Sequence, residues 1–322
     1  VITEFTDVHW ECNGLLDMQR APKMPLDALS ALNADTVLVL DRSQGAWRAG
    51  EQRAIAVGVS HWGAQNLEGA RLSWHIEGQE TTQQQDVGAN VAPRAYQELG
   101  SIELQAPQTP GLYHLHVELL AKNGRVAATS MRLAVYAAQA KPALSVHAYG
   151  SRTLRTALGE AGFAIGEPGE GTLTIADRFD AALRERVLQG EHVVLLASDK
   201  QAITASLGPL RVQARAGTPW QGSWASSFCW MRGDWPGDGI LDDTFLGVMP
   251  SHVITGVAQQ AFSSTVLAGL CVGWIQKPVA LAATQRLGRG QVTVSTFNVA
   301  ERLGADPVAD MVLQALIQAA QQ

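Results

Sequence analysis

The feature that most constrains the fold of this chain is a change in the spacing of apolar residues near residue 140. Between residues 36 and 137, short runs rich in β-forming residues follow one another with turn residues between them. Leu72, Trp74 and Ile76 alternate with polar residues, which is the period of a strand with one buried face. After Pro142, strand-like runs alternate with helix-like runs. One all-β domain and one α/β domain are therefore predicted.

The first of these domains, over residues 36–137, is predicted to be an immunoglobulin-like β-sandwich. About seven strands in about 100 residues are typical of that fold. The Lys122-Asn123-Gly124-Arg125 sequence predicts a tight hairpin between the last two runs. The runs with the strand pattern are Thr36–Leu40, Ala54–His61, Ala70–Glu77, Gly100–Gln105, Tyr113–Leu120 and Ala127–Tyr136.

The second domain, over residues 142–322, is predicted to be an α/β domain with a mostly parallel sheet. Leu154 and Leu158 are four residues apart and Gly162 follows them, as at the end of a helix. Pro307 begins a final amphipathic helix. Further helices and strands are expected at 180–188 (helix) and at 144–147, 172–175, 193–196, 279–284 and 291–296 (strands).

Residues 1–30 have a third pattern. Ile2, Phe5 and Val8 predict a strand, and Asn13-Gly14 predicts a turn. Two prolines at positions 22 and 25 then predict a short, stiff connection. Because the chain opens on a strand-like run, we expect that an N-terminal portion precedes it.

Composition excludes several classes of function. The net charge is −6 with no run of Lys or Arg, which argues against nucleic acid and anionic membrane surfaces as partners. No apolar run approaches the roughly 18 residues of a membrane span. The three cysteines, Cys12, Cys229 and Cys271, fit neither a disulfide framework nor a zinc site. No metal and no cofactor is predicted.

Two segments resemble the end of the catalytic barrel in glycoside hydrolase family 2, which includes β-galactosidases and β-glucuronidases. Phe5-Thr6-Asp7 is similar to the aromatic-x-Asp unit that ends the last barrel strand there. Asn13-Gly14-Leu15 and Arg20-Ala21-Pro22-Lys23 resemble the turn and the exit segment that follow. Residues 287–296 and 304–307 are similar to the closing stretch of a glutamine-amidotransferase-like domain found in distant members. The family often has Trp at the position of Thr3, so the sugar specificity stays open.

The resemblance implies three pieces: a short remnant of a (β/α)₈ barrel at 1–30, the immunoglobulin-like sandwich, and an amidotransferase-like α/β domain. A retaining glycosidase needs two carboxyl groups about 5–5.5 Å apart. In the family both come from earlier strands, so no catalytic residue is expected in this chain. The parent enzyme would hydrolyse β-glycosides, and this chain would dock against its barrel. The sequence does not determine the cellular compartment, and export is one alternative. It does not determine whether the chain forms a homo-oligomer.

The residues just past the expected barrel strand are candidates for one wall of the sugar site. They are Asp7, His9, Trp10 and Glu11, because barrels keep their active sites at the carboxyl ends of the strands. Trp10 would stack on a sugar face and Glu11 would accept sugar hydroxyls. The structural alternative is that Asp7 caps a loop and Trp10 packs on the next domain. Glu4 is interpreted as structural.

A second candidate is a Trp-rich stretch at residues 220–250. Trp224, Trp230 and Trp235 lie near several aspartates, as in a carbohydrate platform. An interface between domains is the favoured alternative. A carbohydrate-binding module is therefore a second hypothesis for function. The spacing of the aspartates does not match a calcium loop.

A third hypothesis is a cysteine-dependent hydrolase or amidotransferase. Gly269-Leu270-Cys271-Val272-Gly273 has the spacing of a nucleophile elbow. Pro278 argues against the helix that an elbow requires. Gly150-Ser151 follows the first strand of the α/β domain, where nucleotide folds bind phosphate, but the Gly-x-Gly-x-x-Gly pattern is missing. No dinucleotide site is predicted.

Overall fold

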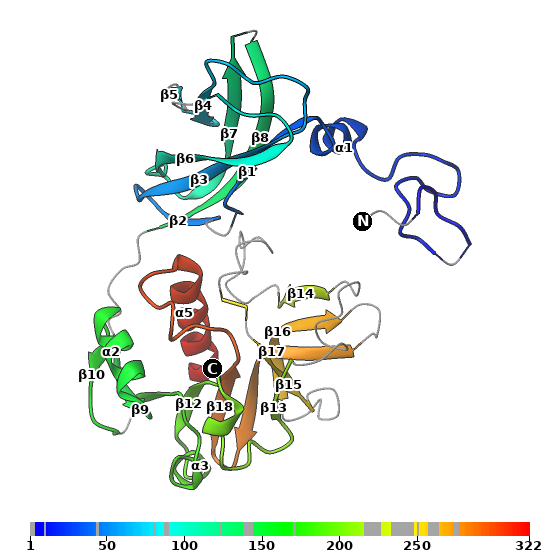
Figure 1. Cartoon of the computed structure of the whole chain (residues 1–322). Coiled ribbons are helices and arrows are strands. Elements are labelled where there is room, and N and C mark those ends of the chain that lie inside the picture. The colour runs from blue at the N-terminus through cyan, green and yellow to red at the C-terminus, as the bar shows by residue number, and fades with distance from the viewer. Residues whose placement is uncertain are drawn as a thin grey trace. The chain divides into compact units, whose positions relative to one another are not determined.

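The computed structural model describes most of the chain. The described residues are 4–9, 11–42, 45–79, 82–86, 90–122, 124–137, 144–169, 172–215, 227–232, 248–249, 251–256, 264–272 and 277–322. They form two compact units (Figure 1). One unit contains residues 1–44, 52–105 and 113–133, and the other contains 45–51, 106–112 and 134–322. No helix in the described ranges is long and apolar enough to cross a membrane.

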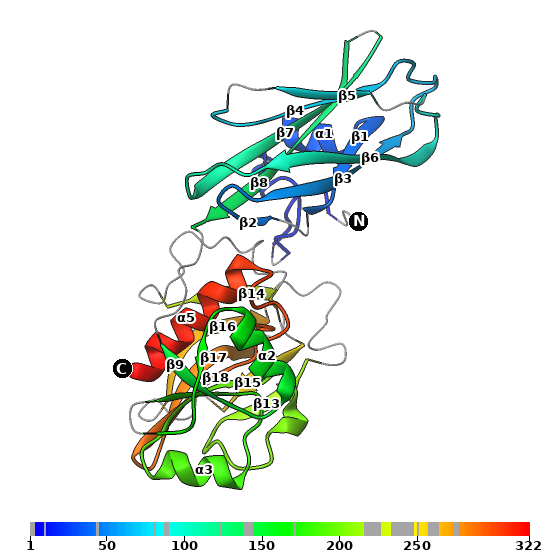
Figure 2. The ribbon, with the colours of Figure 1, turned by 90° about the vertical axis from the view of Figure 1, so that its left-hand side faces the viewer.

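Strands β1 to β8 form an immunoglobulin-like β-sandwich, as predicted for this region. One sheet has the order β1-β3-β6 and the other β2-β8-β7-β4-β5 (Figure 2). The pairs β1–β3, β3–β6, β4–β5 and β4–β7 are antiparallel, and β2 pairs with β8 in parallel. The strands are β1 (Thr36–Leu40), β2 (Ala46–Arg48), β3 (Gln52–His61), β4 (Arg71–Ile76), β5 (Gln83–Asp86), β6 (Ala95–Gln105), β7 (Gly111–Ala121) and β8 (Gly124–Tyr136).

Alternation along these strands decides which side chains enter the sandwich core. Leu115, Val117 and Leu119 on β7 are completely buried, whereas the residues between them are partly exposed. Leu72 on β4 is buried in the same way. The period of two read from the sequence is thus the period of burial. The short strands β2 and β5 were not predicted, because three or four residues give too little pattern.

The first 32 residues differ from the prediction. Residues 4–24 form a loop closed by isolated bridges, Thr6 with Leu16, Val8 with Glu11, and Leu16 with Pro22. The expected barrel strand is not formed by the described residues of this segment, since a strand needs a neighbour to satisfy its backbone. Helix α1 (Leu26–Leu32) then begins directly after Pro25, although the prolines were expected only to end helices.

The α/β region contains a mixed sheet rather than a mostly parallel one. In the described part of the chain its main path runs β10-β9-β11-β12-β18-β17-β15-β13, and β14 and β16 extend it from β17. The strands β10, β9, β11, β12 and β18 are parallel, and the rest are antiparallel. The prediction of a parallel sheet is therefore correct for one half only. The antiparallel half was missed because much of residues 211–272 lacks a clear period.

The bounds of these strands follow. They are β9 (Ser145–Tyr149), β10 (Ala164–Ile165), β11 (Leu173–Ala176), β12 (His192–Leu196), β13 (Arg211–Ala214), β14 (Ser227–Met231), β15 (His252–Thr255), β16 (Ser264–Val272), β17 (Lys277–Leu287) and β18 (Gly290–Ser295). A short 3₁₀ helix, η2, spans Lys200–Ala202.

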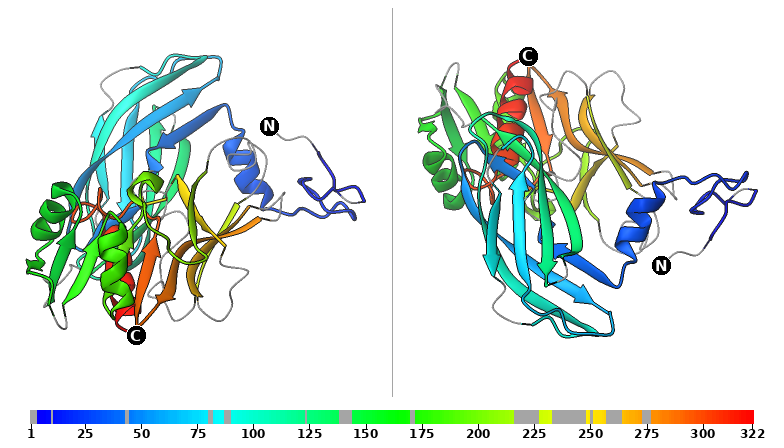
Figure 3. Two further views of the ribbon diagram at one scale, coloured as in Figure 1. Left: turned by 90° about the horizontal axis from the view of Figure 1, so that it is seen from below. Right: turned by 90° about the horizontal axis from the view of Figure 1, so that it is seen from above.

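Helices cover both faces of the parallel half (Figure 3). Helices α2 (Arg152–Glu160) and α5 (Pro307–Gln321) pack with Val146 and Ile175 in one core. Helix α3 (Ala181–Leu188) packs with Val193 and Leu195 in a second core on the other face. All three helices were predicted, and each begins at a residue whose side chain caps it: Ser151, Asp180 or Asp306.

Candidate functional site

Residues of the units Phe5-Thr6-Asp7, Asn13-Gly14-Leu15 and Arg20-Ala21-Pro22-Lys23 meet in one hydrogen-bond network. Lys23 Nζ lies 2.8 and 3.0 Å from the two carboxylate oxygens of Asp7 and donates to the carbonyl oxygen of Cys12 at 2.7 Å. The backbone N–H of Gly14 donates to Asp7 Oδ1 at 2.8 Å. We call residues 4–24 the Asp7 loop. Its centre is the buried carboxylate of Asp7, which binds Gly14 and Lys23. Lys23 in turn binds the carbonyl oxygen of Cys12.

Gly14 is required where it lies. A Cβ added there would meet the backbone nitrogen of Asp7 at 2.5 Å and the carbonyl carbon of Thr6 at 2.6 Å. Both contacts are with backbone, so no side chain can move aside. Two backbone hydrogen bonds, Asp7 N to Leu16 O at 2.9 Å and Leu16 N to Phe5 O at 3.0 Å, hold the chain at this close approach. The Asn-Gly turn therefore packs on the aromatic-x-Asp unit.

Asp7 has a structural role in this arrangement. It is 9% exposed, and the Lys23 ammonium and the Gly14 N–H occupy its oxygens. The hydrogen bond from Lys23 is the largest cause that lowers the pKa of Asp7, and burial opposes it. The carboxylate is therefore held charged as the anchor of a loop. The expectation that Asp7 lines a sugar site stays a prediction, and a ligand hydroxyl would have to share the carboxylate with these donors.

Two of the other candidates of this segment lie among the described residues. His9 is exposed, and Glu11 is half-buried and accepts a bond of 3.4 Å from Asn13 Nδ2. Trp10 lies outside the described residues.

Large apolar side chains near the Asp7 loop are exposed. Of the eleven exposed large hydrophobic residues among the described ones, six belong to the first 32 residues. Phe5 is 70% exposed and Leu32 is 68% exposed. Helix α1 has no buried residue. The six are Phe5, Val8, Met18, Met24, Leu26 and Leu32.

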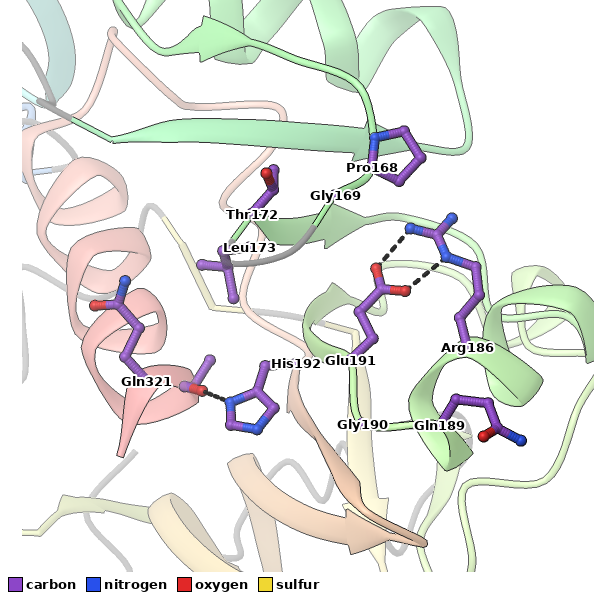
Figure 4. A pocket seen from close by; sticks show the side chains of 11 residues that line it. Pro168, Gly169, Thr172, Leu173, Arg186, Gln189, Gly190, Glu191, His192 and Gln321 are labelled. Atoms are coloured by element: carbon purple, nitrogen blue, oxygen red, sulfur yellow. Dashed lines mark hydrogen bonds and ion pairs between the residues drawn. The ribbon is translucent and has the colours of Figure 1, made fainter.

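A pocket of about 610 Å³ lies in the α/β region at the amino ends of β11 and β12 (Figure 4). Glu191 is the single carboxylate among the described residues that line it. Arg186 binds this carboxylate through two contacts of 2.6 Å, Nε to Oε2 and Nη2 to Oε1. The other lining residues are Pro168, Gly169, Thr172, Leu173, Gln189, Gly190, His192, Ala320 and Gln321.

A buried polar cluster adjoins this pocket. The Thr174 hydroxyl donates to Glu191 and lies 3.1 Å from Nδ1 of His147, which also accepts a 3.3 Å bond from Arg186. Burial, and then the nearby Arg186 charge, lower the pKa of His147, whereas Glu191 and Glu167 raise it less. The cluster is satisfied internally. It has one carboxylate, so it cannot supply the acid and nucleophile of a retaining glycosidase.

At the opposite edge of the sheet, the place where α/β folds usually bind ligands is filled by the protein itself. That place is the carboxyl end of β9, where the chain moves to β10 on one side and later to β11 on the other. Asp177 accepts hydrogen bonds there from the backbone N–H of Ser151, at 2.9 Å, and from its hydroxyl. A carboxylate thus takes the position of a bound anion at the start of α2.

Two further candidates lie in the antiparallel half. Cys271 is on β16, and Val272 pairs with Lys277 of the antiparallel strand β17. The elbow hypothesis is wrong here, because a strand leads into a strand rather than into a helix. Trp230 on β14 is 44% exposed and its ring lies over Gly269. Trp224, Trp235 and the side chains of Cys229 and Cys271 lie outside the described residues.

Comparisons with known proteins give no family. No family model matches the sequence, and no curated protein matches it. Part of the chain is similar to red sea bream transglutaminase, with 17% identity, a TM-score of 0.27, and coverage of 32% of this chain and 15% of that one. The CARDB domain of a Pyrococcus furiosus protein, determined with di-metal ions, gives 11% identity, a TM-score of 0.24, and coverage of 31% and 85%.

The sporulation control protein Spo0M of Bacillus subtilis gives 14% identity and a TM-score of 0.23, with coverage of 39% of this chain and 53% of that one. Matches at this level carry no information about activity, ligand or partner. Function has to be argued from the residues of this chain.

Proposed function

We propose that this chain is the C-terminal accessory portion of a retaining β-glycosidase, and that it has no catalytic centre of its own. Residues 1–30 would belong to the end of the catalytic barrel, the sandwich would follow as a support, and the α/β region would be an amidotransferase-like scaffold without the amidotransferase activity. The parent enzyme would hydrolyse a β-glycoside, and the Asp7 loop would dock against the barrel.

The observation that carries this proposal is the network of Asp7, Gly14 and Lys23. These positions belong to the three separate units in which the sequence resembles the family's barrel exit. One ammonium, one carboxylate and one glycine contact hold them together. A chance similarity of three short segments would not require that their key residues bind one another.

The exposed apolar side chains near the Asp7 loop support docking. Phe5 and Leu32 are each at least two-thirds exposed, which leaves most of their apolar area in water. Burial of apolar area stabilises by about 25 cal/mol per Å². A barrel wall that covered these side chains would therefore bind residues 1–32 without any charged contact.

The polar groups of the α/β region support a scaffold role. Asp177 fills the carboxyl end of β9, and Glu191 in the pocket is paired with Arg186. Both carboxylates are thus bound to a neighbour in the same chain. The strand order β10-β9-β11-β12-β18 is consistent with an amidotransferase-like sheet.

The test compares this chain with the full product of its gene on a panel of p-nitrophenyl β-glycosides. The proposal expects a product longer by several hundred residues that hydrolyses one or more of the substrates, while residues 1–322 alone hydrolyse none. Turnover by this chain alone would contradict it. A gene product of this same length would contradict it as well.

Carbohydrate binding by the antiparallel half is a second candidate, and Trp230 favours it. This indole is 44% exposed and packs on a glycine, so part of its ring is accessible to the C–H groups of a sugar. Affinity electrophoresis in gels with soluble β-glucan or galactan tests this. Retardation that Trp230→Ala removes, with unchanged circular dichroism, supports the binding module, and equal migration with and without polysaccharide argues against it.

A further inference from the structure

Three histidines gather on the outer face of the five-stranded sheet of the sandwich. His114 and His116 are two residues apart on β7, so they project from the same face of that strand. His75 on the antiparallel neighbour β4 is directly opposite His116. The neighbours of His116 in the chain, Leu115 and Val117, point the other way and are buried in the core. We call His75, His114 and His116 the three-histidine face. It holds three of the eight histidines of the chain.

The rings lie at separations that suit one shared metal ion. The ring centres of His75 and His116 are 5.0 Å apart, and those of His114 and His116 are 6.3 Å apart. Two imidazoles bound to one tetrahedral zinc, at the usual Zn–N distance of about 2.0–2.1 Å, have ring centres roughly 5 Å apart. The two ring separations of 5.0 and 6.3 Å are therefore close to the required spacing.

A carboxylate orients one of these rings. Glu77 Oε2 lies 2.9 Å from Nδ1 of His114. A carboxylate in this position accepts a hydrogen bond from Nδ1–H. The lone pair of a neutral imidazole is then on Nε2, where a metal can bind. Metal-bound histidines commonly have such a partner on the second nitrogen. Glu77 thus supplies the contact that a ligand histidine needs.

Cross-strand packing alone does not account for the whole arrangement. The near-parallel stack of His75 on His116, with 18° between the ring planes, is a cross-strand pair of the kind that stabilises a sheet. That gain needs two aromatic residues and neither the third histidine nor its carboxylate. His114 is 42% exposed, so it remains accessible to solutes.

We infer that the three-histidine face binds one divalent transition-metal ion, with Zn²⁺ as the probe. Among the described residues no three His, Cys, Asp or Glu side chains already converge on one point, so binding requires rotation of these side chains. The rotation is accessible, because none of the three rings is buried in the core. Three imidazoles leave the fourth position of a tetrahedral ion open for water or for a further ligand. The site would clamp β4 to β7.

Isothermal titration of the intact chain with ZnCl₂ tests the inference. A Cys12→Ser background removes the exposed thiol, which binds zinc by itself. The expected result is one Zn²⁺ per chain. His116→Gln, which removes the ring shared by both pairs, should weaken binding by more than tenfold. Glu77→Gln should weaken it by about tenfold, as for other partners of metal-bound histidines.

His9→Gln and His252→Gln are matched controls, because both histidines lie outside this face, and each should leave the affinity unchanged. Co²⁺ gives a second readout: visible d–d absorption should appear with the parent chain and disappear with His75→Gln. Equal zinc affinity and stoichiometry in the parent and in both His116→Gln and His75→Gln would overturn the inference. A loss of binding equal to that of His116→Gln in His9→Gln or His252→Gln would overturn it too.

Discussion

Single residues with unusual surroundings decide whether the Asp7 loop keeps its form. Asp7 is buried, yet its partner Lys23 is one-third exposed, so the ion pair lies at the protein surface with only its carboxylate buried. The energy of such a pair depends on how much water reaches it. The two residues are 16 positions apart. Backbone hydrogen bonds also hold the segment that carries Lys23, including Lys23 N to Leu15 O at 3.0 Å.

Replacing Lys23 by Met should raise the pKa of Asp7, because the largest cause of its lowering is removed. The loop should also open more often, so amide exchange at Gly14 should become at least about tenfold faster. Carboxyl ¹³C titration and hydrogen exchange measure the two effects. Lys122→Met is the matched control, since the Lys122–Glu68 pair is well exposed and should change neither quantity. An unchanged Asp7 titration in Lys23→Met would contradict the anchor role.

His147 should make the α/β region less stable in mild acid. Its pKa is lowered in the folded protein, chiefly by burial and then by Arg186, so the unfolded chain binds the proton more tightly. The stability that neutral His147 contributes is therefore present above the ordinary histidine pKa of about 6.5 and is lost as pH falls below it. Urea unfolding at several pH values between 7 and 5 measures this. His147→Gln should have a shallower pH dependence, and an unchanged slope would argue against the assignment.

At the scale of elements, the turn from β9 into α2 is the most constrained point of the α/β region. Gly150 has φ +125°, and a Cβ there would lie 1.9 Å from Asp177 Oδ1. The same carboxylate binds Ser151, whose hydroxyl accepts from Leu154 N and caps the helix. The start of α2 and the end of β11 therefore depend on one residue without a side chain.

Gly150→Ala should destabilise the α/β region by at least about 2 kcal/mol, since it combines a left-handed backbone with a collision. Gly159→Ala is the matched control. Gly159 lies in α2, the helix that follows Gly150, and a Cβ there meets nothing within 4 Å. Alanine is favoured over glycine in a helix by about 1 kcal/mol, so this variant should be neutral or more stable. Equal unfolding midpoints for the two variants would contradict the role of Gly150.

At the scale of the whole molecule, the compact unit with the α/β sheet includes the short segment 45–51. Arg48 from this segment binds Asp310 on α5, with 2.5 Å between Nη2 and Oδ2, and donates to the carbonyl oxygen of Ala305 at 3.2 Å. Asp310 is 4% exposed and also accepts from Gly304 N at 2.7 Å. A buried carboxylate of this kind needs its cation.

Removing that cation should destabilise this unit specifically. Arg48→Met leaves the Asp310 charge buried without the guanidinium, which costs about 3 kcal/mol in comparable pairs. Calorimetry should show two transitions, one for each unit. Leu158→Ala, in the core of the α/β region, identifies the transition of that unit, and Arg48→Met should lower the midpoint temperature of this transition only. The control is Arg125→Met, whose exposed pair with Glu118 should contribute less than about 1 kcal/mol. A shift of the other transition would contradict this assignment.

The sequence by itself determined the parts of this protein that are governed by local patterns. Alternation at Leu72, Trp74 and Ile76 predicted β4, and apolar residues at helical spacing predicted α2 and α5. These predictions succeed because each such strand or helix buries one face, and the spacing of its apolar residues shows which face that is.

Only the tertiary structure decided what depends on partners far apart in the chain. The antiparallel half of the mixed sheet, the pairing of Asp7 with Lys23 and the self-filled site at Asp177 follow from long-range contacts that no local period encodes. The His114-x-His116 spacing was visible in the sequence, but His75 joins it only because β4 pairs with β7 in one register. Register is set by the whole sheet, since a slip of one residue would turn His75 into the core.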